Sequence, residues 1–426
     1  MQFFSPYANK SPDQWRVRVG GNSRIALALG LSIVALLSSE RPTQAQSWNM
    51  YDSYTQSVTL DYLTPQQGAT APALHVKFRG GENIHERTIR VTMDTGSTGM
   101  VIGYNLIDVT GLTPQGTGSI IYTSDNQVHS GTFYDLPVTI TGAAGDSRSA
   151  GGTVRVLVVN TANTAMMGIG IDRGGNPQVN PQYPSAGQNA FLTVDKIDGA
   201  STTPTSFRTG YVVGKDRVTI GLTGASGSGF AMVKLTPNTI YPPNQWNSPQ
   251  AGVIVGGINL GVGTFLPDTG IPYMLVTPQA PVQPGSPCAA PTGICASTTT
   301  PVQIILLPQI PGGLSYSFLA GVSGSSPLTP EYVNLRPVNT ANPLDAASPT
   351  SVNSGVYFYQ GFNYLVDYAG GWIGYQSNGA AGISGFVPLL ALQSTVALPS
   401  GFLTDLPTYL IGATVLEQAG TGTFAS

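Results

Sequence analysis

Short apolar runs with alternating polar positions dominate this chain, and clusters of Gly, Pro, Asn and Asp separate them. Alternation with a period of two is typical of a strand that buries one face. The clearest examples are residues 74–78, 88–93 and 154–159. Helical periodicity is scarce; its best candidate is residues 188–197, followed by residues 389–396, which Pro388 precedes. The pattern therefore predicts an all-β fold, with inserted surface loops at residues 281–301 and 323–349.

Composition favours a location outside the cytoplasm. Charged residues make up 9% of it, far below the roughly 25% of ordinary soluble domains, while Gly (53) and Pro (33) are abundant. An apolar content of 41% over 426 residues is enough for two domains with sizeable cores. We therefore expect a folded, turn-rich, exported protein.

The N-terminal segment has the pattern of a signal peptide. The apolar run at residues 25–37 follows Arg16, Arg18 and Arg24 and precedes the small-residue ending Thr43-Gln44-Ala45. The run is too short to span a bilayer comfortably, and the alternative interpretation is a buried helix. We expect residues 1–45 to be a signal peptide and the protein to be secreted, periplasmic or on the cell surface. The apolar stretch 386–415 is broken by prolines, so we expect no stable membrane span there.

Charge and residue inventory exclude several functions. Removal of residues 1–45 leaves a net charge of about −6, with no basic patch for phosphates, so nucleic acid is not expected as a partner. The three histidines lack metal-ligand spacing, and neither a metal nor another cofactor is expected. Cys288 and Cys295 are the only cysteines, and in an exported loop we expect them to form a small disulfide ring.

The tripeptide Asp-Thr-Gly occurs twice, 174 positions apart, each time behind an apolar run: residues 94–96 and 268–270. A single copy is typical of an Asx-type turn that ends a strand. Two copies in the same context indicate a paired-carboxylate site. Two carboxylates within hydrogen-bonding distance cannot both ionise readily, so the pair holds one proton over a wide pH range.

This arrangement suits peptide hydrolysis. The ionised member takes a proton from a water molecule while the protonated member donates to the peptide carbonyl, without metal or covalent intermediate. In each tripeptide the Asp supplies the carboxylate and the Thr a hydroxyl that ties one loop to the other. The Gly lets backbone N–H groups approach the carboxylate closely.

The chain resembles the pepsin-like aspartic proteases over about residues 55–376. Beyond the two loops, residues 119–138 are similar to the flap hairpin, residues 165–170 to the element that completes the first catalytic loop, and residues 189–213 to the helix and strand between lobes. Residues 355–359, 364–368 and 373–375 resemble the closing strands of the second lobe.

The resemblance implies a bilobal all-β fold, two β-barrel-like lobes with an active-site cleft between them. The N-terminal lobe would be residues 46–210, the C-terminal lobe residues 211–380, and residues 381–426 an extension of unknown role. It implies an aspartic endopeptidase, expected to be a monomer, that binds a protein or peptide as an extended strand. The implied catalytic residues are Asp94 and Asp268; the implied supporting residues are Thr95, Gly96, Ser97, Thr269 and Gly270, and Tyr122 is the implied flap residue.

The sequence departs from the family in three places. Ile271 stands where a hydroxyl residue usually hydrogen-bonds the second catalytic carboxylate, so Asp268 is expected to lack that hydrogen bond. Asn353 and Ser354 replace two apolar residues, and the flap at residues 123–127 is not glycine-rich. These departures keep open an inactive binding protein of the same fold. A third class, an outer-membrane β-barrel or surface structural protein, fits the glycine content and low charge but lacks regular ten-residue dyad-repeat strands.

Overall fold

The computed structural model describes residues 50–64, 70–78, 87–122, 127–143, 147–171, 188–238, 246–278, 294–295, 299–309, 312–320, 325–336, 350–385, 390–392, 417–419 and 423–425. Strands account for 53% of the structure and helix for 2%, which confirms the prediction of an all-β fold. The predicted signal peptide and Cys288 lie outside the described residues, and for Cys295 only the backbone is described. Both predictions therefore stay predictions.

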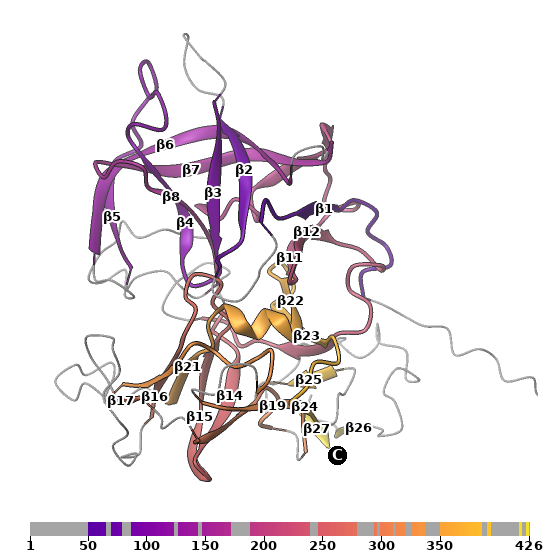
Figure 1. The fold of residues 1–426 in the computed structure, drawn as a ribbon. Coiled ribbons are helices and arrows are strands. Elements are labelled where there is room, and N and C mark those ends of the chain that lie inside the picture. Colours follow the sequence, from indigo (N-terminus) through magenta and orange to yellow (C-terminus); the bar gives the residue numbers. More distant parts are fainter. Residues whose placement is uncertain are drawn as a thin grey trace, which may run out of the picture. The chain divides into compact units, whose positions relative to one another are not determined.

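The first sheet closes on itself (Figure 1). Its strand order is β10-β9-β7-β4-β8-β3-β2-β6-β5, and a further pairing of β6 with β7 closes six of these strands into a barrel. Apolar alternation fills the barrel: Ile89, Val91 and Met93 of β3 are buried, and the residues between them are more exposed. The strands are β2 (Ala73–Phe78), β3 (Arg87–Asp94), β4 (Thr98–Gly103), β5 (Thr117–Tyr122), β6 (Gln127–Thr141), β7 (Ser149–Val159), β8 (Ala165–Ile169), β9 (Val194–Ile197) and β10 (Ala200–Ser201).

The second sheet is a curled half-barrel with the order β17-β20-β16-β21-β15-β14-β18-β19-β24. The prediction of a loop at residues 323–349 is wrong for Val333–Leu335, which forms β20 and is buried because it pairs in parallel with β16. The strands are β14 (Gln250–Val255), β15 (Ile258–Leu266), β16 (Met274–Thr277), β17 (Ile294–Cys295), β18 (Pro301–Ile305), β19 (Ser315–Leu319), β20 (Val333–Leu335), β21 (Thr350–Asn353) and β24 (Ile383–Ser384).

The third sheet collects strands from widely separated parts of the chain, in the order β1-β12-β11-β22-β23-β13-β25. It comprises β1 (Val58–Asp61), β11 (Arg208–Val213), β12 (Arg217–Leu222), β13 (Ala231–Lys234), β22 (Phe362–Asp367), β23 (Trp372–Ser377) and β25 (Leu390–Leu392). A separate two-stranded pairing joins β26 (Glu417–Ala419) and β27 (Thr423–Ala425). The division into lobes at residue 210 stays a prediction; that residue lies inside β11, which pairs with both β12 and β22.

The same local topology occurs twice. Strand β8 lies between β3 and β4, parallel to β3 and antiparallel to β4, and β7 adds in parallel beside β4. Strand β21 lies likewise between β15 and β16, and β20 adds in parallel beside β16. The β3–β4 and β15–β16 connections are the two Asp-Thr-Gly loops. The two motifs therefore occupy equivalent positions in a repeated fold element.

An aromatic cluster supports the strand that leads to the second loop. Phe265 of β15 meets Phe358 edge to face at 5.5 Å between ring centroids, and Phe358 stacks on Phe362 at 4.8 Å. Tyr316 and Tyr375 complete the cluster, and all five residues are at most 1% exposed. Burial of such rings is a large apolar contribution, so the second loop stands on a rigid core.

The helix predicted at residues 188–197 is wrong. Asn189 accepts the backbone N–H of Phe191 at its side-chain oxygen (3.0 Å) and donates from its side-chain nitrogen to Ile169 O (2.9 Å). This side-chain turn competes with helical hydrogen bonds. The residues that follow, Val194–Ile197, form β9 and pair with β7.

Two further expectations are corrected. Residues 355–359 resemble a closing strand in the sequence, but Val356–Gln360 forms a short 3₁₀-helix, η2, behind Gly355 at φ 67°. A left-handed residue interrupts an extended strand, and a methyl group on Gly355 would lie 2.4 Å from Tyr273 O. Of the predicted helix at residues 389–396, Leu390–Leu392 is instead β25, paired in parallel with β13. Within the described residues, no helix has the length and apolar character needed to cross a membrane.

Candidate active site

The two Asp-Thr-Gly loops are tied to each other by their threonines. Thr95 Oγ1 accepts the backbone N–H of Thr269 (2.8 Å), and Thr269 Oγ1 accepts that of Thr95 (3.0 Å). Each hydroxyl also donates across, Thr95 to Pro267 O (2.6 Å) and Thr269 to Met93 O (2.9 Å). Both threonines are at most 3% exposed. Because buried hydrogen bonds are costly to leave unmade, this reciprocal link holds the loops in one relative position.

The carboxylates of Asp94 and Asp268 face each other across this link. Gly96 N–H donates to Asp94 Oδ1 and Gly270 N–H donates to Asp268 Oδ1, both at 2.7 Å. A methyl group on Gly270 would lie 2.7 Å from Asp94 Oδ1 and 3.1 Å from Asp268 Oδ1. One on Gly96 would lie 2.4 Å from Asp268 Oδ2. Only glycine leaves room at either position for two carboxylates that approach so closely.

The outer oxygens of the pair have different partners. Ser97 Oγ donates to Asp94 Oδ2 at 2.5 Å, as expected for a hydroxyl three residues after the carboxylate. At the equivalent position after Asp268, Ile271 has no hydroxyl to offer. Instead Asn353 Nδ2 donates to Asp268 Oδ2 at 2.5 Å. The expectation that Asp268 lacks this hydrogen bond is therefore wrong, because the end of β21 supplies it.

The sequence alone does not reveal this role of Asn353. The residue lies 85 positions after Asp268 and reaches it because β21 runs parallel to β15, with Asn353 opposite Leu266. The signal in the sequence is a polar side chain where the resembled family has an apolar one. The role of Tyr359 is likewise not visible in the sequence; the residue is fully buried, and its hydroxyl donates to Pro267 O at 3.1 Å beneath the second loop.

The environment of the pair disfavours two negative charges. Asp94 and Asp268 are each 6% exposed. Burial, then the neighbouring charge of Asp268, raises the pKa of Asp94 to about 8, against the opposing hydrogen bonds from Ser97 and Gly96. A carboxyl whose pKa is raised in this way stays protonated at pH values where an exposed one is ionised. Asp94 therefore keeps its proton through the acidic and neutral range.

Tyr122 lies at the end of β5, in the hairpin expected from the sequence. Strands β5 and β6 pair in antiparallel fashion, with Tyr122 opposite Gln127. The ring of Tyr122 meets His129 edge to face at 5.3 Å and packs on a buried cluster of Val101, Ile120, Phe133, Leu157 and Val159. The tip, residues 123–126, lies outside the described residues. A role of Tyr122 over the carboxylate pair stays a prediction.

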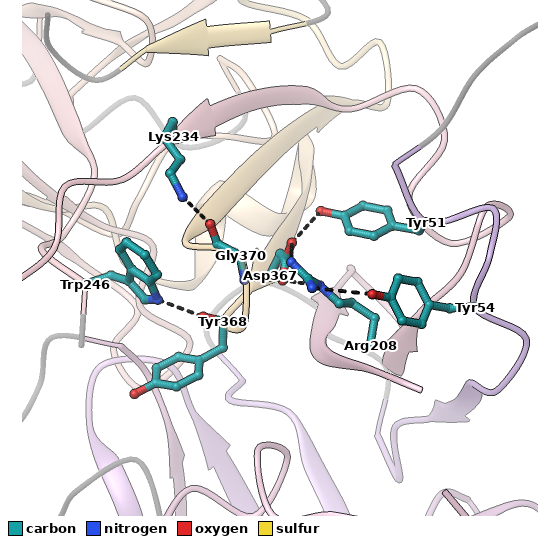
Figure 2. A network of polar contacts seen from close by, with 8 residues as sticks. All are labelled: Tyr51, Tyr54, Arg208, Lys234, Trp246, Asp367, Tyr368 and Gly370. Atoms are coloured by element: carbon teal, nitrogen blue, oxygen red, sulfur yellow. Dashed lines mark hydrogen bonds and ion pairs between the residues drawn. The ribbon is translucent and has the colours of Figure 1, made fainter. Parts of the chain in front are cut away.

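A further buried carboxylate, Asp367, belongs to the structural frame (Figure 2). Arg208 donates to both of its oxygens at 2.9 Å, Gly370 N–H donates to Oδ1 at 2.9 Å, and the Tyr51 hydroxyl donates to Oδ2 at 3.3 Å. Asp367 is 0% exposed. Its oxygens are occupied by donors within the protein, so we assign this cluster to the attachment of residues 51–54 to β11 and β22.

The same network continues on the other side of the β22–β23 turn. The amine of Lys234 donates to Gly370 O and lies 4.6 Å from the ring centroid of Trp246, whose indole N–H donates to Tyr368 O at 2.7 Å. Burial lowers the pKa of Lys234. These contacts join β13 to the turn after β22, and they complete the anchoring of the third sheet. Among the described residues, no group of three or more His, Cys, Asp or Glu side chains could hold a metal ion.

The chemistry of the carboxylate pair is that of one acid and one base held at a fixed distance. Such a pair can take a proton from a molecule on one side and give a proton to a molecule on the other in a single step. No protein-family model matches this sequence, and no curated protein matches it. The geometry of the two loops is thus the observation on which a function must be argued.

Proposed function

We propose that this protein is an exported aspartic endopeptidase with a pepsin-like fold. The observation that carries the proposal is the pair of buried carboxylates, Asp94 and Asp268, which face each other on loops tied by reciprocal threonine hydrogen bonds. Two acidic side chains are buried together at a cost in free energy. A structural role for the pair would be served equally well by apolar or amide side chains, so the retained acids favour catalysis.

In the proposed reaction the ionised member of the pair removes a proton from a water molecule, whose oxygen attacks the carbonyl carbon of the scissile peptide. The protonated member donates its proton to the carbonyl oxygen, which gives a neutral gem-diol intermediate. Proton transfer to the amide nitrogen and cleavage of the carbon–nitrogen bond then release an acid and an amine. The atoms balance as peptide plus water.

The repeated topology supports the pepsin-like part of the proposal. The first barrel carries one loop and the second half-barrel the other, each flanked by a parallel and an antiparallel strand. We propose that an extended substrate lies across the two loops and is held mainly by main-chain hydrogen bonds. The β5–β6 hairpin with Tyr122 would then cover the substrate as a flap.

An inactive binding protein of the same fold is less well supported. The main reason to suspect lost catalysis is Ile271, which cannot hydrogen-bond Asp268. Asn353 donates to the outer oxygen of Asp268, Oδ2, at 2.5 Å, just as Ser97 donates to the outer oxygen of Asp94. Each outer oxygen of the pair therefore has a hydrogen-bond donor.

The test is digestion of casein and haemoglobin across acidic to neutral pH by the full chain produced through an export pathway. Wild type is expected to cleave at acidic pH, and Asp94→Asn and Asp268→Asn are each expected to abolish cleavage. Asp61→Asn is the matched control, since Asp61 is 59% exposed in a surface ion pair with Arg217. Cleavage that survives both site variants would remove the pair from the mechanism. Absence of cleavage by folded wild type at every pH would favour the binding protein.

A further inference from the structure

Asn353 is held in one orientation by a second contact. Its Oδ1 accepts the backbone N–H of Gly355 at 3.0 Å, while its Nδ2 lies 2.5 Å from Asp268 Oδ2. A backbone N–H can only donate, so the oxygen of the amide must face Gly355. The NH₂ group therefore points at Asp268, and an amide flip would place two donors together on one side and two acceptors on the other.

The two outer contacts of the pair differ in what they allow. The hydroxyl of Ser97 can donate a hydrogen bond to Asp94 Oδ2. After rotation, it can instead accept a hydrogen bond from Oδ2 when that oxygen carries the proton. The amide nitrogen of Asn353 cannot accept, so a proton on the lone pair of Asp268 Oδ2 that meets Asn353 would point at another N–H. The inner oxygen, Asp268 Oδ1, already accepts Gly270 N–H at 2.7 Å. These contacts thus accommodate a proton on the outer oxygen of Asp94 better than one on the outer oxygen of Asp268.

We infer that Asn353 is a positioning residue that keeps Asp268 as the ionised member of the pair and leaves the shared proton on Asp94. The assignment of catalytic roles rests on the proposed function: Asp268 is then the base that activates water, and Asp94 is the acid that protonates the carbonyl oxygen. The location of the proton does not depend on that function.

Among the described residues, the titratable groups that bear on this order are Asp94, Tyr359 and Glu331. Asp94 faces it from the first loop, and burial with the charge of Asp268 raises the pKa of Asp94 to about 8. Tyr359 of η2 lies beneath the loop, and burial raises its pKa well above the ordinary value, so it stays neutral. Glu331, exposed on the segment whose backbone N–H donates to Pro272 O, is the acidic residue of the element packed behind the loop.

The first test needs no proteolysis. Wild-type protein is labelled at the carboxyl carbons of aspartate, the two signals are assigned with Asp94→Asn and Asp268→Asn, and both are followed by NMR from acidic to alkaline pH. The expected result is that the signal of Asp268 reaches the ionised position first and that of Asp94 follows at higher pH. Ionisation of Asp94 before Asp268 would overturn the inference, whether or not the protein cleaves peptides.

The second test exchanges the donor. In Asn353→Asp the new side chain has nearly the same shape and can still accept Gly355 N–H, but it presents an oxygen in place of the NH₂ group. The NMR signals of Asp94 and Asp268 are expected to titrate in the reverse order or together. The acidic limb of the pH profile of kcat/KM, where activity rises with pH, is expected to move up by about one pH unit or more. Ser354→Ala is the control, because Ser354 Oγ donates to backbone at Leu266 O and its loss is expected to leave the limb unchanged. An unmoved limb and an unchanged signal order in Asn353→Asp would overturn the inference.

A rescue separates positioning from general damage. Asn353→Leu removes the donor, and adding Ile271→Ser places a hydroxyl three residues after Asp268, as Ser97 stands after Asp94. The single variant is expected to move the acidic limb upward and the double variant to return it toward wild type. Loss of activity that the hydroxyl does not restore, with the limb of both variants at the wild-type pH, would count against the inference. Loss of cleavage in wild type itself would remove the proposed function and leave the NMR result to decide the position of the proton.

Discussion

The hydroxyl of Thr95 accepts the backbone N–H of Thr269, and the hydroxyl of Thr269 accepts the backbone N–H of Thr95. Each hydroxyl also donates a hydrogen bond to a carbonyl that precedes the opposite loop, Thr95 to Pro267 O and Thr269 to Met93 O. The two halves of the site are therefore held together by four buried hydrogen bonds within one small region. The carboxylates that these loops carry depend on this link for their separation.

Thr95→Val and Thr269→Val are each expected to destabilise the protein by about 1–3 kcal/mol, since valine has nearly the same shape but leaves buried backbone groups without partners. The double variant is expected to cost less than the sum of the singles, because both remove the same link. Denaturant unfolding measures the stabilities, and peptide cleavage the loss of rate.

The control for this pair is Thr59→Val. The hydroxyls of Thr59 and Thr219 also form a hydrogen bond, at 2.9 Å, but on the exposed face of the third sheet. Its loss is expected to change stability by no more than about 0.5 kcal/mol. Equal losses of stability in Thr59→Val and Thr95→Val would show that the link between the loops stabilises the protein no more than an exposed hydrogen bond does.

Gly96→Ala and Gly270→Ala are expected to leave a folded protein with at least about a hundredfold lower kcat, because a methyl group at either site displaces a carboxylate. Gly252→Ala is the matched change in β14, where a methyl group would make ordinary contacts at 3.4 Å or more. Circular dichroism checks the fold and steady-state kinetics the rate. Wild-type kcat in the Gly270 variant would show that the two carboxylates need not approach closely.

The raised pKa of Asp94 predicts a stability that falls as pH rises. In the unfolded chain this carboxyl ionises near its ordinary value of about 4, whereas in the folded protein its pKa is about 8. Between these values the folded state binds more protons at Asp94 than the unfolded state, so the contribution of Asp94 to stability is full below about pH 4 and declines toward pH 8.

Replacement of this acid is expected to have the opposite effect on stability and on activity. Near neutral pH, Asp94 must take up a proton when the chain folds. Asp94→Asn removes that cost and is expected to stabilise the protein by at least about 1 kcal/mol, while cleavage is lost. Tm measured against pH for wild type, Asp94→Asn and the surface control Asp61→Asn tests this. A Tm of Asp94→Asn that follows the wild-type curve at all pH values would contradict the raised pKa.

Asp367→Ala is expected to destabilise the protein by about 3–5 kcal/mol, because it leaves the charge of Arg208 half-buried without its partner. The exposed pair of Arg155 and Asp135 offers the comparison, and Asp135→Ala is expected to cost no more than about 1 kcal/mol. Thermal unfolding measures both. A small loss at Asp367 would indicate that residues 51–54 are anchored by apolar contacts instead.

Much of the fold class could be predicted because strand periodicity is local. The alternation at residues 88–93 needs no distant partner to be visible, and it lies within β3. The helix prediction at residues 188–197 is wrong because distant partners decide the structure there. Their apolar spacing suits a helix, but a side-chain turn at Asn189 and pairing with β7 prevent one. Residues 333–335 likewise become a strand because β16 lies beside them.

For the site, the sequence by itself determined the paired motif: which two acids, which glycines beside them and which hydroxyls could join the loops. These follow from residue types within a few positions of each other. Only the tertiary structure decided what meets the outer oxygen of Asp268, since Asn353 reaches it through the parallel pairing of β21 with β15. The direction of that amide, and with it the asymmetry of the pair, depends on a contact with Gly355 that exists only after the chain has folded.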